Sequence, residues 1–237
     1  MDVHRSVRAR QRILAIFLPV AAVLYVSAEA LDPRGTDQIV TTTSAGVKLL
    51  AIAAKHPGQL YVAGTLSIFA LGALAVSYAA LALLVPHRGW VVATVGALVG
   101  GIGAFCGAIV NVLVGISLAA AATAHTAPDA GARFLVTSFN SGAGQLFTYL
   151  YFITEYTAPV IMGYALWRSR SVPLWLVVLF TVGFEVAAAQ SSKGPLVILF
   201  MLPWAVAMVL LAARIWQSAA RPAARDPRLD PEPVSSL

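Results

Sequence analysis

Charged residues are scarce in this sequence: Asp, Glu, Lys and Arg make up 11% of its 237 residues, against about 25% in ordinary soluble domains. Hydrophobic residues make up 59%, and the mean hydropathy is +0.81. A soluble fold of this size cannot bury so much apolar surface. The shortage of charge therefore excludes an ordinary soluble protein and favours one compact, membrane-embedded helix bundle without a separate soluble domain.

Cysteine and histidine are also rare. The single cysteine, Cys106, excludes an internal disulfide framework, a CxxC redox pair and a zinc site built on several thiolates. The histidines argue against a bis-histidine haem inside the bundle, because all four lie outside the apolar runs or at their ends: His4, His56, His87 and His125. No lysine lies inside an apolar run, which excludes a retinal Schiff base. We expect neither a metal nor a cofactor.

Motifs for nucleotides and nucleic acids are missing as well. The sequence has no P-loop and no GxGxxG in a strand-to-helix context. Its net charge of +6 comes from short basic clusters beside apolar segments, which is not a nucleic-acid-binding pattern. The stretch 140–145 carries the glycine-flanked serine of intramembrane proteases, but no later apolar run contains a histidine to activate it.

Six apolar runs remain, and they predict an all-α, polytopic membrane bundle of six transmembrane helices. The expected spans are about 13–30, 60–85, 90–122, 134–167, 174–190 and 195–216. A basic segment, 1–12, precedes them, and a proline-rich polar segment, 218–237, is expected to be a disordered tail. The first run resembles a signal peptide, but its length, Pro19 and Tyr25 favour an uncleaved helix.

Two segments need separate interpretation. The long first loop contains apolar residues at helical spacing from Thr36 to Lys55, followed by a His-Pro-Gly stop. We expect an interfacial or capping amphipathic helix there, or a plain surface helix resting on the bundle.

The fourth run, 134–167, is longer than one span needs and begins with polar residues. Its first part is expected to be tilted, broken or partly outside the membrane.

The basic residues predict the orientation. The connections on one side of the membrane carry eleven Lys and Arg residues, and those on the other side carry five. Because the more basic side usually faces the cytoplasm, we expect both termini to be cytoplasmic and the protein to lie in the inner (plasma) membrane. Four tryptophans flank the cytoplasmic ends as an aromatic belt would: Trp90, Trp167, Trp175 and Trp216.

The third run is rich in glycine. Gly96 and Gly100, like Gly103 and Gly107, match the small-xxx-small pattern of closely packed membrane helices. Packing within one chain is the favoured interpretation, and contact with a second copy or a partner protein is the alternative. Asn111, in the same run, needs a polar partner.

Two carboxylates stand inside apolar runs. Glu155 and Glu185 each lie 15 residues from Arg170 in the basic turn between their helices. About twelve residues of helix at 1.5 Å each place both roughly 18 Å deep. A charged group there costs about 2.5–3.5 kcal/mol, so both should face the interior. Tyr151 and Thr181 lie on the same helix faces. The pair is a candidate site that shares or exchanges a proton, or a hydrogen-bonded structural pair.

Further polar residues belong to the opposite, extracytoplasmic half of the bundle. They are expected to line a vestibule open to the outside, or simply to mark helix ends: Glu29, Asn111, Asn140, Gln145, Gln190 and Lys193.

The layout resembles the small six-helix integral membrane proteins of unknown function found in actinobacteria. The resemblance rests on the short first helix, the long loop ending in Ala-Lys-His-Pro-Gly and the Pro-His-Arg-Gly turn before a glycine-rich third helix. It implies an architecture and no activity.

Three functions remain as hypotheses. The first is a small transporter-like or ligand-binding protein with a small-molecule or proton ligand at Glu155 and Glu185. The second is a structural or assembly subunit that docks through Gly96–Gly107. The third is a lipid-modifying enzyme, for which the sequence offers no paired nucleophile and base.

Overall fold

The computed structural model describes residues 3–35, 42–85, 88–124, 127–189 and 193–220, and every regular element in these ranges is a helix. The described chain is therefore all-α, as the sequence predicts. Its elements, in chain order, are α1 (Val3–Leu31), α2 (Thr43–Lys55), α3 (Pro57–Ala82), α4 (Trp90–Asn111), the π-helical turn η1 (Val112–Ile116), α5 (Ser117–Thr123), α6 (Pro128–Asn140), α7 (Gly142–Ser169), α8 (Leu174–Ala189) and α9 (Val197–Ala220).

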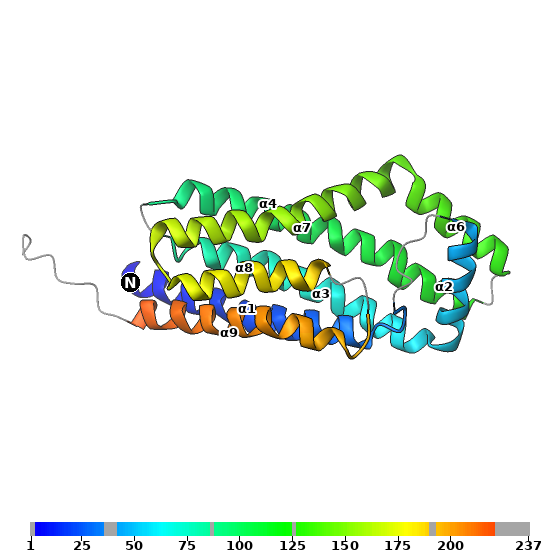
Figure 1. Cartoon of the computed structure of the whole chain (residues 1–237), viewed down its shortest axis with the longest axis horizontal. Helices are drawn as coiled ribbons and strands as arrows, with labels where there is room; N and C mark the ends of the chain where they lie inside the picture. Colours follow the sequence, from blue (N-terminus) through cyan, green and yellow to red (C-terminus); the bar gives the residue numbers. More distant parts are fainter. Residues whose placement is uncertain (1–2, 36–41, 86–87, 125–126, 190–192, 221–237) are drawn as a thin grey trace, which may run out of the picture.

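Six of these helices pack as a closed ring. Going around it, α1 contacts α3, α3 contacts α4, α4 contacts α7, α7 contacts α8, α8 contacts α9, and α9 contacts α1. Neighbours in the ring run in opposite directions (Figure 1). The shared core consists mainly of alanine and aliphatic side chains, with Trp204 and Phe180 as its largest fully buried members.

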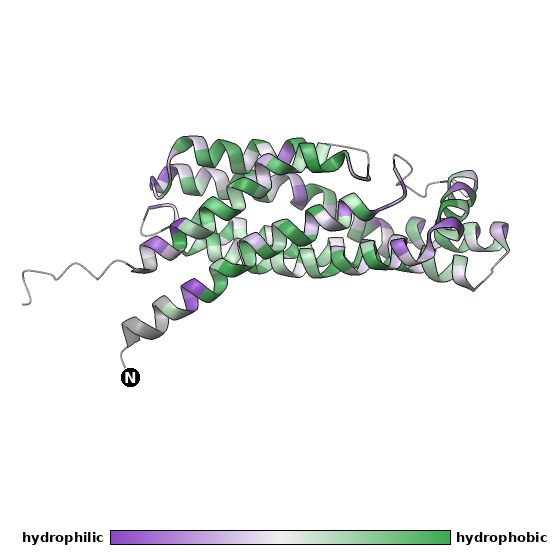
Figure 2. Cartoon of the chain, turned by 90° about the horizontal axis from the view of Figure 1, so that it is seen from below, coloured by the Kyte–Doolittle hydropathy of each residue, from purple (hydrophilic) through white to green (hydrophobic). Residues whose placement is uncertain are grey.

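Four helical stretches are long and apolar enough to cross a membrane: Ala9–Leu31, Pro57–Ala82, Trp90–Thr123 and Val197–Ser218. α7 has the length, but Glu155 and several tyrosines reduce its hydropathy, and α8 has only 16 residues. The outward faces carry exposed apolar side chains such as Phe69, Leu98 and Leu199, and apolar residues dominate the bundle (Figure 2). Such a surface is typical of contact with lipid, so the helices indicate an integral membrane protein.

The N-terminal end of α1 and the C-terminal end of α9 lie at the same end of the ring, which we call the terminal end (Figure 1). There the Arg12 guanidinium lies 5.8 Å from the centroid of the Trp216 ring. Trp90, Trp167 and Trp175 are each more than half exposed. α1 begins at Val3, so the helix extends into the basic segment that we had placed outside the first span.

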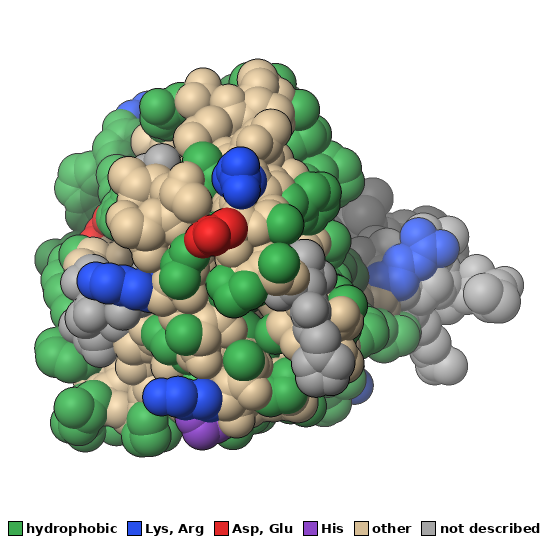
Figure 3. All heavy atoms as spheres, turned by 90° about the vertical axis from the view of Figure 1, so that its right-hand side faces the viewer, with side chains coloured by type: hydrophobic (Ala, Val, Ile, Leu, Met, Phe, Trp, Pro, Cys, Tyr) green, Lys and Arg blue, Asp and Glu red, His purple; other side chains and the backbone are tan. Residues whose placement is uncertain are grey.

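The opposite end, which we call the capped end, carries α2, α5 and α6. α2 packs across α5 and α6, and a second hydrophobic core lies under it, formed by Leu49, Leu50, Ala53, Leu60, Val114, Leu118, Ala119, Ala132 and Leu135. Charged side chains are scattered over the described surface of this end and form no single patch (Figure 3). The loop helix expected from Thr36 is observed from Thr43, and residues 36–41 lie outside the described residues.

The fourth run, 134–167, is broken at Ser141, which is one of the alternatives expected for its first part. The Ser141 hydroxyl accepts a hydrogen bond from the Gly144 amide at 3.1 Å, which makes Ser141 the N-cap of α7. α6 begins earlier, at Pro128, where proline suits the first helical turn. The polar residues at the start of the run therefore belong to the end of α6 and to the first turn of α7.

The four glycines of the small-xxx-small pairs in α4 are buried and pack within the chain. Gly96 and Gly103 face α7, Gly100 faces Tyr78 of α3, and Gly107 faces both helices. The close helix approach that the small-xxx-small pattern predicts is thus made to α3 and α7. This face is covered and does not offer the docking surface that the assembly-subunit hypothesis requires.

Candidate functional site

A cavity of about 300 Å³ lies inside the ring, toward the capped end. This volume is at the lower limit for small-molecule pockets. Its aromatic lining residues are Tyr25, Phe139, Tyr151, Phe152, Tyr156 and Phe184. Its charged and polar lining residues are Glu29, Arg34, Asn111, Thr148, Glu155 and Lys193. The lining side chains come from both ends of the sequence, so only the closed ring brings them together.

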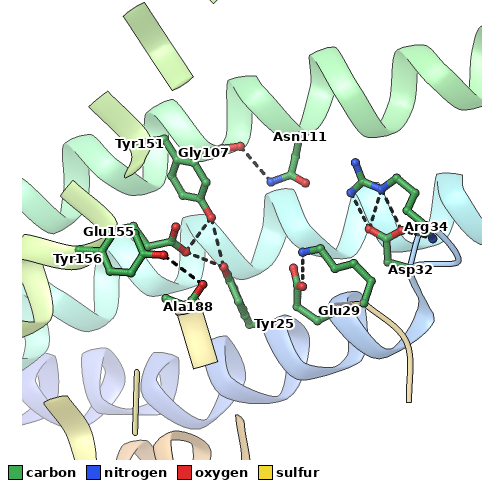
Figure 4. Close-up of polar contacts among 11 residues, drawn as sticks. Tyr25, Glu29, Asp32, Arg34, Gly107, Asn111, Tyr151, Glu155, Tyr156 and Ala188 are labelled. Atoms are coloured by element: carbon green, nitrogen blue, oxygen red, sulfur yellow. Dashed lines mark hydrogen bonds and ion pairs between the residues drawn. The ribbon is translucent and has the colours of Figure 1, made fainter. Parts of the chain in front are cut away.

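Glu155 is held in this cavity by two tyrosine hydroxyls. Its Oε1 accepts a hydrogen bond from the Tyr151 hydroxyl at 2.8 Å and from the Tyr25 hydroxyl at 3.1 Å (Figure 4). The two hydroxyls lie 3.3 Å apart. No side chain or amide of the described residues donates to Oε2, which is not sealed by protein atoms. One carboxylate oxygen is therefore fixed, and the other is available to a ligand or a proton.

An ion pair between Glu29 and Lys193 lies at the side of the cavity nearer the capped end (Figure 4). The backbone holds the two together, because the Lys193 amide donates to the Gly35 carbonyl at 2.8 Å and the Gly194 amide donates to the Glu29 carbonyl at 2.9 Å. The pair joins the end of α1 to the connection before α9. Both side chains are about 15% exposed, so the charges compensate each other in a mostly buried place.

A second ion pair, Asp32–Arg34, follows directly after α1. Arg34 Nε donates to both carboxylate oxygens at 2.9 and 3.0 Å, and both residues are more than 90% buried. Burial favours the neutral acid, but the hydrogen bonds and positive charge of Arg34 outweigh it, so the pKa of Asp32 lies below its ordinary value. The carboxylate likewise raises the pKa of the Arg34 guanidinium. The pair is structural and fixes the loop that borders the cavity.

The charges along the cavity wall therefore do not all cancel. Arg34 is paired with Asp32, and Lys193 is paired with Glu29. Glu155 is the carboxylate of the described lining that has hydroxyl partners and no cation. An ionised Glu155 thus leaves the wall with one negative charge.

Irregular backbone lies beside the cavity. Asn111 ends the regular part of α4, where its amide donates to the Gly107 carbonyl at 3.0 Å, and the π turn η1 follows. π turns inserted into α-helices are frequent at functional sites. On α7, Pro159 lacks the amide that would bond to the Glu155 carbonyl in a regular helix. Both features allow a helix to present polar groups to the interior.

Glu185 does not join Glu155. It does not line the cavity, and its Oε1 is buried without a hydrogen-bond partner among the described residues. The Thr181 hydroxyl lies 3.5 Å from the Pro159 carbonyl, and both residues are 11 positions from Arg170, so α7 and α8 do align about the turn. Each residue of a helix is rotated by about 100° from the previous one. The alignment of α7 and α8 agrees with a similar depth for the two carboxylates, but Glu155 lines the cavity and Glu185 does not.

The other predicted residues are distributed as follows. Tyr151, Asn111, Glu29 and Lys193 line the cavity, whereas Thr181 lies between α7 and α8. Asn140 and Gln145 are exposed on the surface and do not line it. Gln190 lies outside the described residues. Of the residues expected to line a vestibule, Glu29, Asn111 and Lys193 line this cavity.

Tyr25 is the main cavity residue that the sequence interpretation missed. Tyr25 precedes Glu29 by four residues, as Tyr151 precedes Glu155. Residues four apart lie on the same face of a helix, so both helices present a tyrosine and a carboxylate together. This repeated Tyr-x-x-x-Glu spacing is the sequence feature that could have indicated Tyr25 as a cavity residue.

The described residues contain no group of three or more His, Cys, Asp or Glu side chains that could hold a metal ion. Comparison of the chain with protein-family models, with curated proteins and with solved structures found no match.

Proposed function

We propose that this protein is a six-span protein of the plasma membrane with both termini in the cytoplasm. The antiparallel ring of six helices supports this topology, as does the location of the start of α1 and the end of α9 at one end of the ring (Figure 1). The excess of basic residues in the connections at the terminal end supports its orientation. The capped end, with α2 and α6, then faces the outside.

The function we propose for it is the binding of a small solute, as in a transporter, with Glu155 as the group that receives the solute or a proton. One observation carries this proposal: a carboxylate stands in a cavity inside a membrane bundle, and among the described residues it has two hydroxyls and no cation as partners, with one oxygen left free. Intramembrane ionisable groups commonly mark solute or proton pathways.

A thermal-unfolding screen tests the proposal. The purified full chain in mild detergent is heated with acetate, glycerol, glycine betaine or choline, which represent an anion, a neutral solute, a zwitterion and a cation. A ligand that binds only the folded chain at 100 times its Kd stabilises it by about 2.7 kcal/mol. We expect one of these classes to raise the unfolding temperature.

Glu155→Gln and Glu185→Gln form a matched pair of variants, because both carboxylates lie at similar depth and only Glu155 lines the cavity. Stabilisation by the solute should disappear in Glu155→Gln and persist in Glu185→Gln. The binding solute is then offered to proteoliposomes with an inward proton gradient, which should accelerate its uptake. If no class stabilises the chain, or if both variants behave like the unchanged protein, the proposal is wrong.

A further inference from the structure

We propose that the ligand of this cavity is a small organic ammonium ion, seated between Glu155 Oε2 and the aromatic wall. The inference rests on the proposed function and adds the chemical class of the solute.

The first argument is the sign of the charge that the cavity leaves uncompensated. Two cations border it, but Arg34 donates to Asp32 and Lys193 is paired with Glu29. An anionic solute would have to take one of these cations from its carboxylate. A cationic solute breaks neither pair and supplies a positive partner for Glu155, which has none among the described residues. Opposite charges attract more strongly where water is partly excluded, so an ammonium group facing Oε2 would be a strong contact even without an N–H.

The second argument is the aromatic lining. Six aromatic side chains line a cavity of about 300 Å³. Aromatic faces attract cations, and the attraction grows when water is excluded, which is how proteins recognise substituted ammonium groups. The carboxylate supplies the charge, and the rings supply a surface for the alkyl groups around the nitrogen.

The third argument is that parts of the wall are fixed before a ligand arrives. Trp204 is fully buried and meets the Tyr25 and Phe184 rings edge to face, with centroids 5.8 and 5.4 Å away. The Tyr156 hydroxyl donates to the Ala188 carbonyl of α8 at 3.2 Å (Figure 4). A preformed wall of this kind lowers the ordering cost of binding. The wall suits a compact ligand.

The test compares choline with 3,3-dimethylbutan-1-ol, which has the same shape but carries carbon in place of the charged nitrogen. Binding of each to the full chain in detergent is followed by tryptophan fluorescence, since Trp204 contacts two lining rings. We expect a Kd for choline at least tenfold lower than that for the alcohol. The preference should vanish in Glu155→Gln and remain in Glu185→Gln, and Phe184→Leu should weaken choline binding by a larger factor than it weakens binding of the alcohol.

The outcomes separate this inference from the proposed function. Equal affinity for choline and the alcohol, or tighter binding of acetate than of choline, overturns the ammonium assignment while a solute-binding function stands. Binding of none of the three probes, together with a negative thermal screen, overturns both. The comparison of probes on the unchanged chain needs no variant, so a poorly folding Glu155→Gln does not prevent the test.

Discussion

Replacing Gly107 by alanine should disturb both the packing of α4 and the carboxylate site. An alanine Cβ at this position would lie 2.7 Å from the Tyr151 ring and 3.2 Å from a Leu71 methyl group. Carbon atoms pack best at about 3.5–4.0 Å, so the ring has to move by about 1 Å. The 2.8 Å hydrogen bond from the Tyr151 hydroxyl to Glu155 would then exceed the range of a good bond.

Gly101 provides the control, because it lies in the same helix and a Cβ there would meet no atom within 4 Å. Both substitutions gain about 0.5–1 kcal/mol from the better helix propensity of alanine. Overpacking costs about 1–3 kcal/mol and applies only at Gly107. The propensity gain cancels in the comparison, so Gly107→Ala should be less stable than Gly101→Ala by about 1–3 kcal/mol.

The assay is reversible unfolding in mixed micelles, followed by circular dichroism, together with the choline titration. Gly107→Ala should also bind choline more weakly than Gly101→Ala does. Equal stability of the two variants would refute the packing of Gly107 against Tyr151, and equal choline binding would refute the dependence of the site on that ring.

Two further predictions concern the ion pairs. Asp32→Asn leaves Arg34 buried without its partner and should destabilise the chain by about 3–5 kcal/mol, whereas the exposed Asp129→Asn should have little effect. Folding lowers the pKa of Asp32, so the ionised carboxylate stabilises the folded chain fully above the ordinary pKa of about 3.9. This stabilisation is lost as the pH falls through the lower pKa of the folded state. An identical dependence of unfolding on acid pH in the unchanged chain and in Asp32→Asn would contradict this. In a double-mutant cycle of Glu29→Gln and Lys193→Met, the coupling energy should lie between about 0.5 and 3 kcal/mol, and a value near zero would show that the pair is not formed.

Much of the helical architecture was predictable, because apolar runs and the turns between them are local features. The segment from Trp90 to Thr123 and the helix before Arg168 follow directly from composition. The break at Ser141 was harder to predict, since it depends on which residue caps α7, and several polar residues around it were candidates. The sequence therefore indicated that these helices exist more clearly than it indicated where they begin and end.

The depth of Glu155 and Glu185 in the bundle was predictable from the sequence, but which of them lines the cavity was not. The turn at Arg170 sets the height of Glu155 and Glu185, and the alignment of Thr181 with Pro159 agrees with that height. Which side chains of a helix face the cavity depends on the rotation of that helix about its axis, and tertiary packing determines this rotation. Tyr25, 130 positions before Glu155, is its hydrogen-bond partner because α1 belongs to the same ring as α7, and the short Tyr-x-x-x-Glu pattern does not show which helices meet.

The most direct test of the central claim asks whether water from the capped end reaches the cavity beside Glu155. In a chain with Cys106 replaced by serine, Ala188→Cys places a thiol in the cavity wall, and Val186→Cys places one on the apolar outer face, two positions away. Intact cells are treated with a membrane-impermeant maleimide. The account predicts that Ala188→Cys is labelled from outside and that choline slows this labelling, while Val186→Cys stays unlabelled. Labelling of Val186→Cys in place of Ala188→Cys, or of neither, would contradict a water-filled binding cavity open to the outside.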